Sequence, residues 1–158
     1  MENNSHKTAI SRKKLPAPTR HLLEKGVLVG NLLDFGCGKC AELNNAEFAK
    51  YSNIASVTNY DPYHNDVEIK ADYYDTVICN YVLNTLLEDN QDIFLKGIQK
   101  LLNKNGVAYI AVRTDTPKSG WGHNARGTYQ RKVDIKDLFV YTENQNFKIY
   151  TLTKYSQY

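Results

Sequence analysis

The sequence predicts an α/β fold in which a mostly parallel, twisted sheet has helices on both faces and a C-terminal antiparallel hairpin. Three observations support this class. Short apolar runs of strand length alternate with helical patterns, which is typical of a parallel sheet covered by helices. One apolar run, residues 32–35, ends at a turn that contains Gly36 and Gly38. Near the end of the chain, two apolar stretches flank the polar segment 142–146, which favours a hairpin.

Local signals place the elements in order. Pro16 and Pro18 suit the first turn of a helix, and Gly26 suits its end. Apolar residues at helical spacing over 91–102 predict an amphipathic helix. Asn105-Gly106 then turns the chain into another apolar strand. The expected elements are a helix over 16–25, a strand over 31–35, a helix over 41–51, a strand over 54–60, a brief strand over 67–69, a strand over 74–79, a helix over 91–102, a strand over 107–112 and hairpin strands over 133–141 and 147–153.

Length and composition limit the classes of protein. The 158 residues suffice for one domain, which we place at 16–158 after a basic N-terminal arm over 1–15. No apolar run approaches the ~20 residues of a membrane-spanning helix, and the first six residues lack the apolar segment of a signal peptide. Three cysteines, an odd number, argue against a disulfide framework and for a reducing compartment. We therefore expect a cytoplasmic protein without a membrane partner, and its oligomeric state stays open.

The glycine turn is the candidate ligand site. Gly36 and Gly38 can adopt backbone angles that other residues resist, and the helix that follows offers free N–H groups at its start. Asp61 ends the next expected strand, at the distance where an acid contacts ribose hydroxyls in dinucleotide-binding folds. The alternative for Asp61 is a structural role in the turn before Pro62. Ligands of open α/β sheets bind beyond the carboxyl ends of the strands, where all these residues should meet.

Asn80 and Tyr81 follow the strand over 74–79 and should lie at the same edge of the sheet. We predict that they orient a substrate and act as the catalytic residues. The alternative for Asn80 is the capping of a helix.

Positive charge is concentrated in two segments. Residues 1–26 contain six Lys and Arg against two Glu, a net charge of +4, and residues 113–132 contain five against one Asp, again +4. Trp121 and Tyr129 lie among the cations of the second segment, and cations with aromatics suit the phosphates and stacked bases of a nucleic acid. We predict that arm and loop close the site together, although a solvated arm and loop are the alternative. The candidate substrate-binding residues are Arg12, Lys13, Arg113, Arg126, Tyr129 and Arg131.

The cysteine spacing raises two rival interpretations. Cys37-x-x-Cys40 is typical of a redox pair or, with Cys79, of part of a zinc site. Zinc would need a fourth ligand such as His64, and the spacing coincides with the glycine turn. We therefore expect no metal.

Residues 32–40 resemble motif I of the class I S-adenosylmethionine (AdoMet) methyltransferases, Leu-Asp-x-Gly-x-Gly-x-Gly, with Cys40 in place of the third glycine. The resemblance implies the Rossmann-like class I methyltransferase fold and AdoMet as cofactor. It places Asp34 near the methionine amino group of AdoMet. The segment Asn80-Tyr81-Val82-Leu83 lacks the two prolines that identify some amino-group methyltransferases. The implied cofactor-binding residues are Asp34, Gly36, Cys37, Gly38, Asp61, Pro62 and Asn80.

Four further segments, residues 6–15, 60–64, 79–84 and 127–131, are similar to the methyltransferases associated with DNA phosphorothioation and to their short stand-alone relatives in bacteria and phages. This similarity covers about residues 6–154. It implies an AdoMet-dependent methyltransferase that acts on nucleic acid, with DNA or RNA as partner. The alternatives are a catalytically degenerate AdoMet-binding or interaction subunit and a small-molecule methyltransferase.

Overall fold

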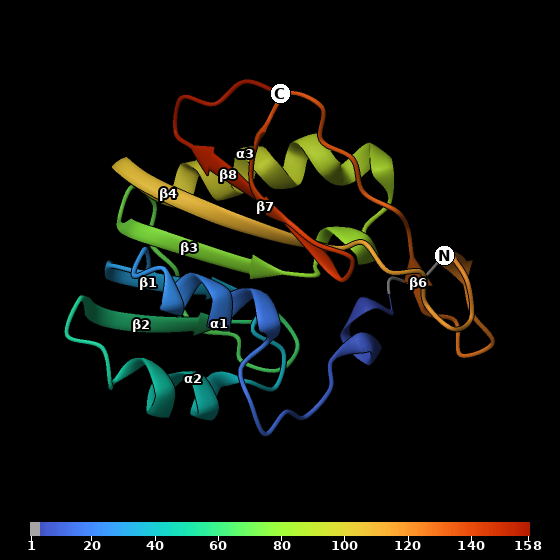
Figure 1. The fold of residues 1–158 in the computed structure, drawn as a ribbon, viewed down its shortest axis with the longest axis horizontal. Coiled ribbons are helices and arrows are strands. Elements are labelled where there is room, and N and C mark those ends of the chain that lie inside the picture. Colours follow the sequence, from blue (N-terminus) through green and yellow to red (C-terminus); the bar gives the residue numbers. More distant parts are fainter. Residues whose placement is uncertain (1–3) are drawn as a thin grey trace.

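The computed structural model describes residues 4–158, and Figure 1 shows its sheet with helices packed against it. The strands are β1 (Gly30–Phe35), β2 (Ile54–Tyr60), β3 (Tyr74–Asn80), β4 (Leu102–Arg113), β5 (Gly122–His123), β6 (Tyr129–Gln130), β7 (Phe139–Glu143) and β8 (Phe147–Thr153). The α-helices are α1 (Ala17–Glu24), α2 (Ala41–Phe48) and α3 (Gln91–Leu101), and the 3₁₀ turns are η1 (Ser5–Thr8), η2 (Leu83–Thr85) and η3 (Glu88–Asn90).

Six of these strands form one sheet in the order β2-β1-β3-β4-β8-β7. The first four run parallel, and β8 and β7 join them as an antiparallel hairpin. β5 and β6 form a separate antiparallel pair. The predicted fold class is therefore confirmed.

The two faces of the sheet carry separate apolar cores. Neighbouring residues of a strand point to opposite faces, and β1 follows this rule. Leu33 packs in a cluster with Ile98 of α3, whereas Leu32 packs in a second cluster with Leu22 of α1 and Phe48 of α2. The helices therefore cover both faces, as the alternating pattern of the sequence predicts.

One expected strand is absent, and another begins later than expected. Residues 67–69 form no strand, and Val67 is exposed, so its apolar side chain has no core to pack against. The first strand of the hairpin begins at Phe139 instead of residue 133. Val133 and Ile135 are nevertheless buried, because irregular chain packs them into the core on the α3 side.

The expected turn at Asn105-Gly106 is also wrong, because β4 already begins at Leu102. Leu102 pairs with Tyr74, but the register then shifts. The residues between Leu102 and Val107 absorb this irregularity inside the strand. The expected helix over 41–51 ends three residues early, at Phe48.

The order of the strands creates a topological switch point between β1 and β3. From β1 the chain crosses to β2 on one side, and β3 then pairs with β1 on the other side. Such a switch point at the carboxyl ends of parallel strands is where open α/β sheets bind ligands. In Figure 1, η1 and the segment with β6 lie beyond these strand ends, so the arm and the loop both flank the edge. Among residues 4–158, no helix has the length and apolar character needed to cross a membrane.

Candidate functional site

A cavity of about 510 Å³ lies at the carboxyl ends of β1, β2 and β3. This volume is in the usual range of small-molecule sites. The glycine turn forms one wall, and residues of the N-terminal arm form another. The cavity brings together all the residues predicted to bind cofactor, although their individual roles stay predictions. These residues are Asp34, Gly36, Cys37, Gly38, Asp61, Pro62 and Asn80.

Asp34 is an acid of β1 held almost out of solvent, with 5% of its surface exposed. Its Oδ2 accepts a 2.7 Å hydrogen bond from Asn44 Nδ2, but its buried Oδ1 has no partner among residues 4–158. Burial raises the pKa of Asp34, and the hydrogen bond from Asn44 lowers it. Burial has the larger effect, so the pKa lies at about 7. A buried acceptor without a partner in a cavity wall suits a cationic ligand group. The ammonium of the methionine part of AdoMet is such a group.

Asn44 positions Asp34, and the sequence pattern did not identify it as a site residue. Asn44 is fully buried in α2, and its amide nitrogen also donates to Asn59 Oδ1 of β2 at 2.7 Å. Asn59 in turn donates to Asn45 Oδ1 at 2.9 Å. The polar side chains therefore connect α2 to the ends of β1 and β2. The only sequence signal is a pair of asparagines in a helix, which is equally common on solvated faces.

The glycine turn is fixed to the end of β2. The N–H groups of Gly36 and Cys37 both donate to Tyr60 O, at 2.8 and 2.9 Å. Gly36 has φ +86°, and a Cβ built there would overlap Val82 Cγ2. Cys40, by contrast, has φ −96°, which any residue adopts. The cysteine in place of the third glycine is therefore compatible with this backbone, and the close approach that a cofactor needs is preserved at Gly36.

Asp61 organises the turns on both sides of the cavity. Its Oδ2 accepts from Gly38 N at 3.0 Å, and its Oδ1 accepts from Tyr63 N and His64 N at 2.9 Å each. A carboxylate has about four acceptor sites, so one remains for a ribose hydroxyl. The structural role proposed as the alternative is thus present, and the contact with ribose stays a prediction.

We expect Asp61→Asn to weaken AdoMet binding by about 10- to 100-fold, the usual range for one lost hydrogen bond to a charged group. The amide nitrogen of Asn cannot accept a hydrogen bond, so the variant loses either the bond from Gly38 N or the bonds from Tyr63 N and His64 N. Calorimetric titration of AdoMet measures the effect. Asp66→Asn is the matched control, because Asp66 is exposed in the same connection and lines no cavity. Equal losses in both variants would contradict the role of Asp61.

Asn80 and Tyr81 lie at the end of β3, in the cavity wall. Asn80 Nδ2 donates to Thr19 Oγ1 of α1 at 2.8 Å, and its buried Oδ1 has no partner among residues 4–158. Tyr81 has φ +64°, a left-handed conformation that costs about 1–2 kcal/mol for a residue with a side chain. The capping alternative for Asn80 is wrong, because the following turn η2 has Val82 at its N-cap and no side-chain cap.

The N-terminal arm covers the cavity through contacts with residues 63 and 64. The His6 ring stacks on Tyr63 with ring centroids 3.9 Å apart. His64 Nε2 lies 3.3 Å from His6 O. Thr8 and Arg12 of the arm line the cavity beneath these contacts. Neither the stack nor the histidine contact could be predicted, because residues almost sixty positions apart form them.

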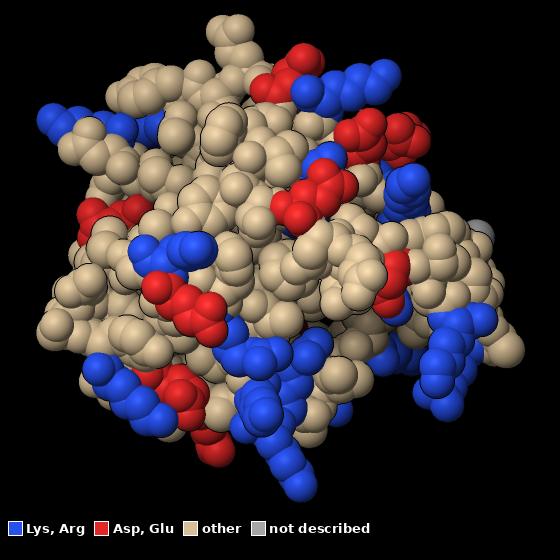
Figure 2. Space-filling view, viewed as in Figure 1, with Lys and Arg blue, Asp and Glu red and all other residues tan. Residues whose placement is uncertain are grey.

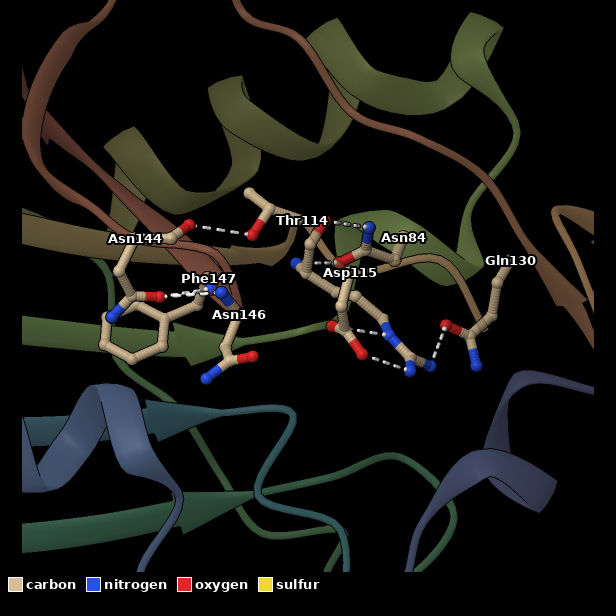
Figure 3. Close-up of polar contacts among 8 residues, drawn as sticks. Asn84, Thr114, Asp115, Gln130, Asn144, Asn146 and Phe147 are labelled. Carbon is tan, nitrogen blue, oxygen red and sulfur yellow. Dashed lines mark hydrogen bonds and ion pairs between the residues drawn. The ribbon is translucent and has the colours of Figure 1, made fainter. Parts of the chain in front are cut away.

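A second cavity of about 430 Å³ adjoins the first. Arg113 at the end of β4 binds Asp115 through two hydrogen bonds, Nε to Oδ1 at 3.0 Å and Nη2 to Oδ2 at 2.8 Å. Arg113 Nη1 also donates to Gln130 Oε1 at 3.3 Å, and Figure 3 shows Asp115 and Gln130 on either side of this guanidinium. The hydrogen bond from Arg113 lowers the pKa of Asp115, which therefore stays ionised at neutral pH. The two cavities share Thr8, Ile10, Arg12, Tyr81 and Thr85.

Asn84 holds the backbone of this wall in place through hydrogen bonds (Figure 3). Its Oδ1 accepts from Arg113 N at 2.8 Å, and its Nδ2 donates to Arg131 O at 3.0 Å. Asn84 is buried in η2 and links β4 to the loop that carries β6. The sequence resemblance included this residue without assigning it a role.

The six predicted substrate-binding residues separate in the structure. Arg12 and Arg113 line a cavity, whereas Lys13, Arg126 and Tyr129 do not. Figure 2 shows Lys and Arg side chains at several places on this face, with a group of them together at the bottom of the view.

Arg131 is only 9% exposed. Its Nε donates to Leu86 O at 2.6 Å and its Nη2 to Gln91 Oε1 at 2.8 Å. These bonds hold the guanidinium in a nearly buried position, which favours a role in supporting the loop.

The three cysteines are free and buried. Burial raises the pKa of each thiol, so the reactive thiolate is disfavoured at neutral pH. Within residues 4–158, no three His, Cys, Asp or Glu side chains are grouped to hold a metal ion.

The comparisons with known proteins agree with this geometry. A family model described as a methyltransferase domain matches residues 8–152. The structure resembles the Burkholderia thailandensis 1,6-didemethyltoxoflavin-N1-methyltransferase, at 13% identity and a TM-score of 0.61, over 85% of this chain and 76% of that one. It also resembles the DhpI–SAH complex, at 15% identity and a TM-score of 0.51, over 85% and 82% of the two chains. No curated protein sequence matches the chain.

At these identities the solved structures show the fold, whereas the family model covers nearly the whole chain and shows the family. The similarity to phosphorothioation-associated enzymes finds no support in these comparisons. The chain therefore belongs to the methyltransferase domain family, which confirms the predicted enzyme class and its cofactor, AdoMet.

Proposed function

We propose that the chain transfers the methyl group of AdoMet to an acceptor held in the second cavity. The observation that carries this proposal is the shared wall of the two cavities, which includes Thr8, Tyr81 and Thr85. A donor bound at the glycine turn and an acceptor bound beside Arg113 would meet across this wall. The alignment of the two reactants is the main contribution that a protein makes to such a transfer.

The chemistry of the lining residues favours an acceptor atom with a lone pair of its own. When bound, AdoMet supplies a methyl group on a sulfonium sulfur, and this electrophile needs little acid–base help. Asp115, the acid of the second cavity, is held ionised by Arg113 and is therefore a weak base. Tyr81 lines both cavities, so it can position the acceptor against the donor. Asn80 lines the first cavity only, and its Oδ1, which has no partner within the described chain, can accept a hydrogen bond from an N–H group that reaches into that cavity.

Nucleic acid is the finer proposal for the acceptor. The second cavity offers Gln130, Asp115 and hydroxyl groups, a mixture of donors and acceptors that suits the edge of a base. Lys13 and Arg126 are exposed and available to phosphates. A base would have to be single-stranded or flipped to reach the methyl donor.

A small-molecule acceptor is the second candidate. The Burkholderia enzyme of the same fold was crystallised with 1,6-didemethyltoxoflavin and S-adenosylhomocysteine (AdoHcy). The modest volume of the second cavity, about 430 Å³, supports this candidate for the present chain as well.

Turnover of AdoMet tests the proposal. We expect AdoHcy to form when the protein is incubated with AdoMet and single-stranded DNA or RNA, and not with either reactant alone. Binding of the strand should weaken about tenfold between 50 and 200 mM salt if two phosphates are contacted. Binding of AdoMet without turnover on any acceptor would instead support the degenerate-subunit alternative. Turnover with a nucleoside or another small molecule, but with neither nucleic acid, would support the second candidate.

A further inference from the structure

Within the described part of the chain, Arg12 forms no ion pair, and it lies at the junction of the two cavities. It lines both of them. None of the ion pairs among residues 4–158 involves Arg12, whereas the nearby Arg113 is already bound by Asp115. Its guanidinium therefore has donors to spare for an anionic ligand group, and it can present two of them to a carboxylate in one plane.

Asp34 lines the same cavity and carries the complementary charge. The two residues do not form an ion pair with each other. Both charges nevertheless act on one group, the thiol of Cys40. Burial raises the pKa of Cys40, the negative charge of Asp34 raises it further, and the positive charge of Arg12 lowers it. An acid of β1 and a guanidinium of the arm thus line the same cavity, and both act on Cys40 in its wall.

We propose that Arg12 binds the α-carboxylate of the methionine part of AdoMet, opposite Asp34, which binds its α-ammonium. A zwitterion needs such a pair of opposite charges, separated by the amino acid itself. This inference rests on the proposed function, because it assigns Arg12 to the cofactor rather than to the acceptor. Arg12 is a positioning residue in this arrangement, since the methyl group is carried on the sulfur, away from the carboxylate.

The position of Arg12 in the sequence gives this contact a second consequence. Arg12 belongs to the arm, which also covers the cavity through the His6–Tyr63 stack. A cofactor held by Arg12 therefore holds the arm in place and completes the wall that both cavities share. A nucleoside without the amino acid part would leave the arm without this contact.

Lys39 is the alternative anchor for the carboxylate. It also lines the first cavity and is exposed, as Arg12 is, but it does not line the second cavity. Its variant therefore belongs in the test. Lys14 is the matched control for net charge, because it is exposed on the same arm and lines neither cavity.

The experiment compares two ligands in four proteins by calorimetric titration. AdoHcy carries the amino acid part, and 5′-methylthioadenosine lacks it. Wild type, Arg12→Gln, Lys39→Gln and Lys14→Gln are titrated with each. We expect Arg12→Gln to weaken AdoHcy binding by about 10- to 100-fold and 5′-methylthioadenosine binding by less than about twofold. Lys14→Gln and Lys39→Gln should change either affinity by less than about twofold, because the inference assigns the carboxylate to Arg12 and an exposed charge that contacts no ligand contributes little.

Three outcomes overturn the inference. The first is an Arg12→Gln variant that binds AdoHcy as wild type does. The second is an equal loss of affinity for both ligands in Arg12→Gln. The third is a selective loss of AdoHcy affinity in Lys39→Gln instead. In each of these cases wild type still binds AdoHcy, so the proposed function stands. A wild-type protein that binds neither ligand overturns the proposed function and this inference together.

Discussion

Gly36→Ala should weaken AdoMet binding by about 100-fold or more, as measured by calorimetric titration. The added Cβ meets two obstacles. The φ of +86° at Gly36 is one that residues with side chains resist. The Cβ would also overlap Val82 Cγ2 across the cavity wall. Strain and overpacking of this kind each cost about 1–3 kcal/mol, and every 1.4 kcal/mol is tenfold in affinity. The glycine turn must therefore shift, and the cofactor loses the surface that it lies against.

Gly26→Ala is the matched control for this variant. Gly26 has a similar φ of +68°, but a Cβ there meets no atom within 4 Å, and Gly26 lines neither cavity. We expect it to lose about 1 kcal/mol of stability from the backbone alone and to bind AdoMet as wild type does. Adding Val82→Ala to Gly36→Ala should restore much of the affinity, because the nearest side-chain atom would then be Val82 Cβ, 3.8 Å away. A double variant that binds no better would show that the collision with Val82 is not the cause.

The glycine turn also shows how far the sequence alone could lead. An apolar run, an acid and two glycines define a strand and a tight turn from local chemistry, and the structure places them as expected. The acids and amides after successive strands could be assigned to one edge, because the carboxyl ends of parallel strands meet there. These inferences need only local patterns and one rule of topology.

The contacts that complete the site are not local, and they were missed for that reason. Asn44 reaches Asp34 across a helix–strand interface, and Asn84 links η2 to β4 and to the loop that carries β6. Arg131 shows the same limit. Its charge and its place in a basic loop predict a contact with substrate, and the sequence gives no sign that Leu86 O and Gln91 bind its guanidinium in a nearly buried position. The orientation of a long side chain depends on the partners that the fold provides, and composition does not reveal them.

Asp34→Asn should change affinity and stability in opposite directions. The variant removes the carboxylate that faces the cofactor's ammonium, so we expect AdoMet binding to fall by about 10- to 100-fold. It also removes a charge from a buried site where Oδ1 has no partner within the described chain. The free energy of unfolding at pH 8 should therefore rise, by an amount of order 1 kcal/mol or more. Calorimetric titration and thermal unfolding measure the two effects. A variant that loses both AdoMet affinity and stability would have lost its fold. The role of Asp34 would then be tested by the pH dependence of AdoMet binding in wild type.

The pH dependence follows from the raised pKa of Asp34, about 7 in the folded protein. Between the ordinary pKa of Asp near 4 and this value, the folded state holds a proton that the unfolded state does not. This group therefore stabilises the fold at low pH, and its contribution is lost as the pH rises through 7. AdoMet binding has the opposite trend, because the ammonium requires the ionised carboxylate. We expect the affinity of wild type to be about tenfold lower at pH 6 than at pH 7.5.

The variant Asp34→Asn is needed to assign this trend, because it removes only the carboxylate. We expect the affinity of this variant to vary less than about twofold between pH 6 and 7.5, because the carboxyl whose pKa is raised to about 7 is absent from it. If the slope of wild type persisted in the variant, Asp34 would not be its source. A flat profile, together with higher stability and weaker binding of AdoMet, would show that the Asp34 carboxylate destabilises the fold and binds the cofactor.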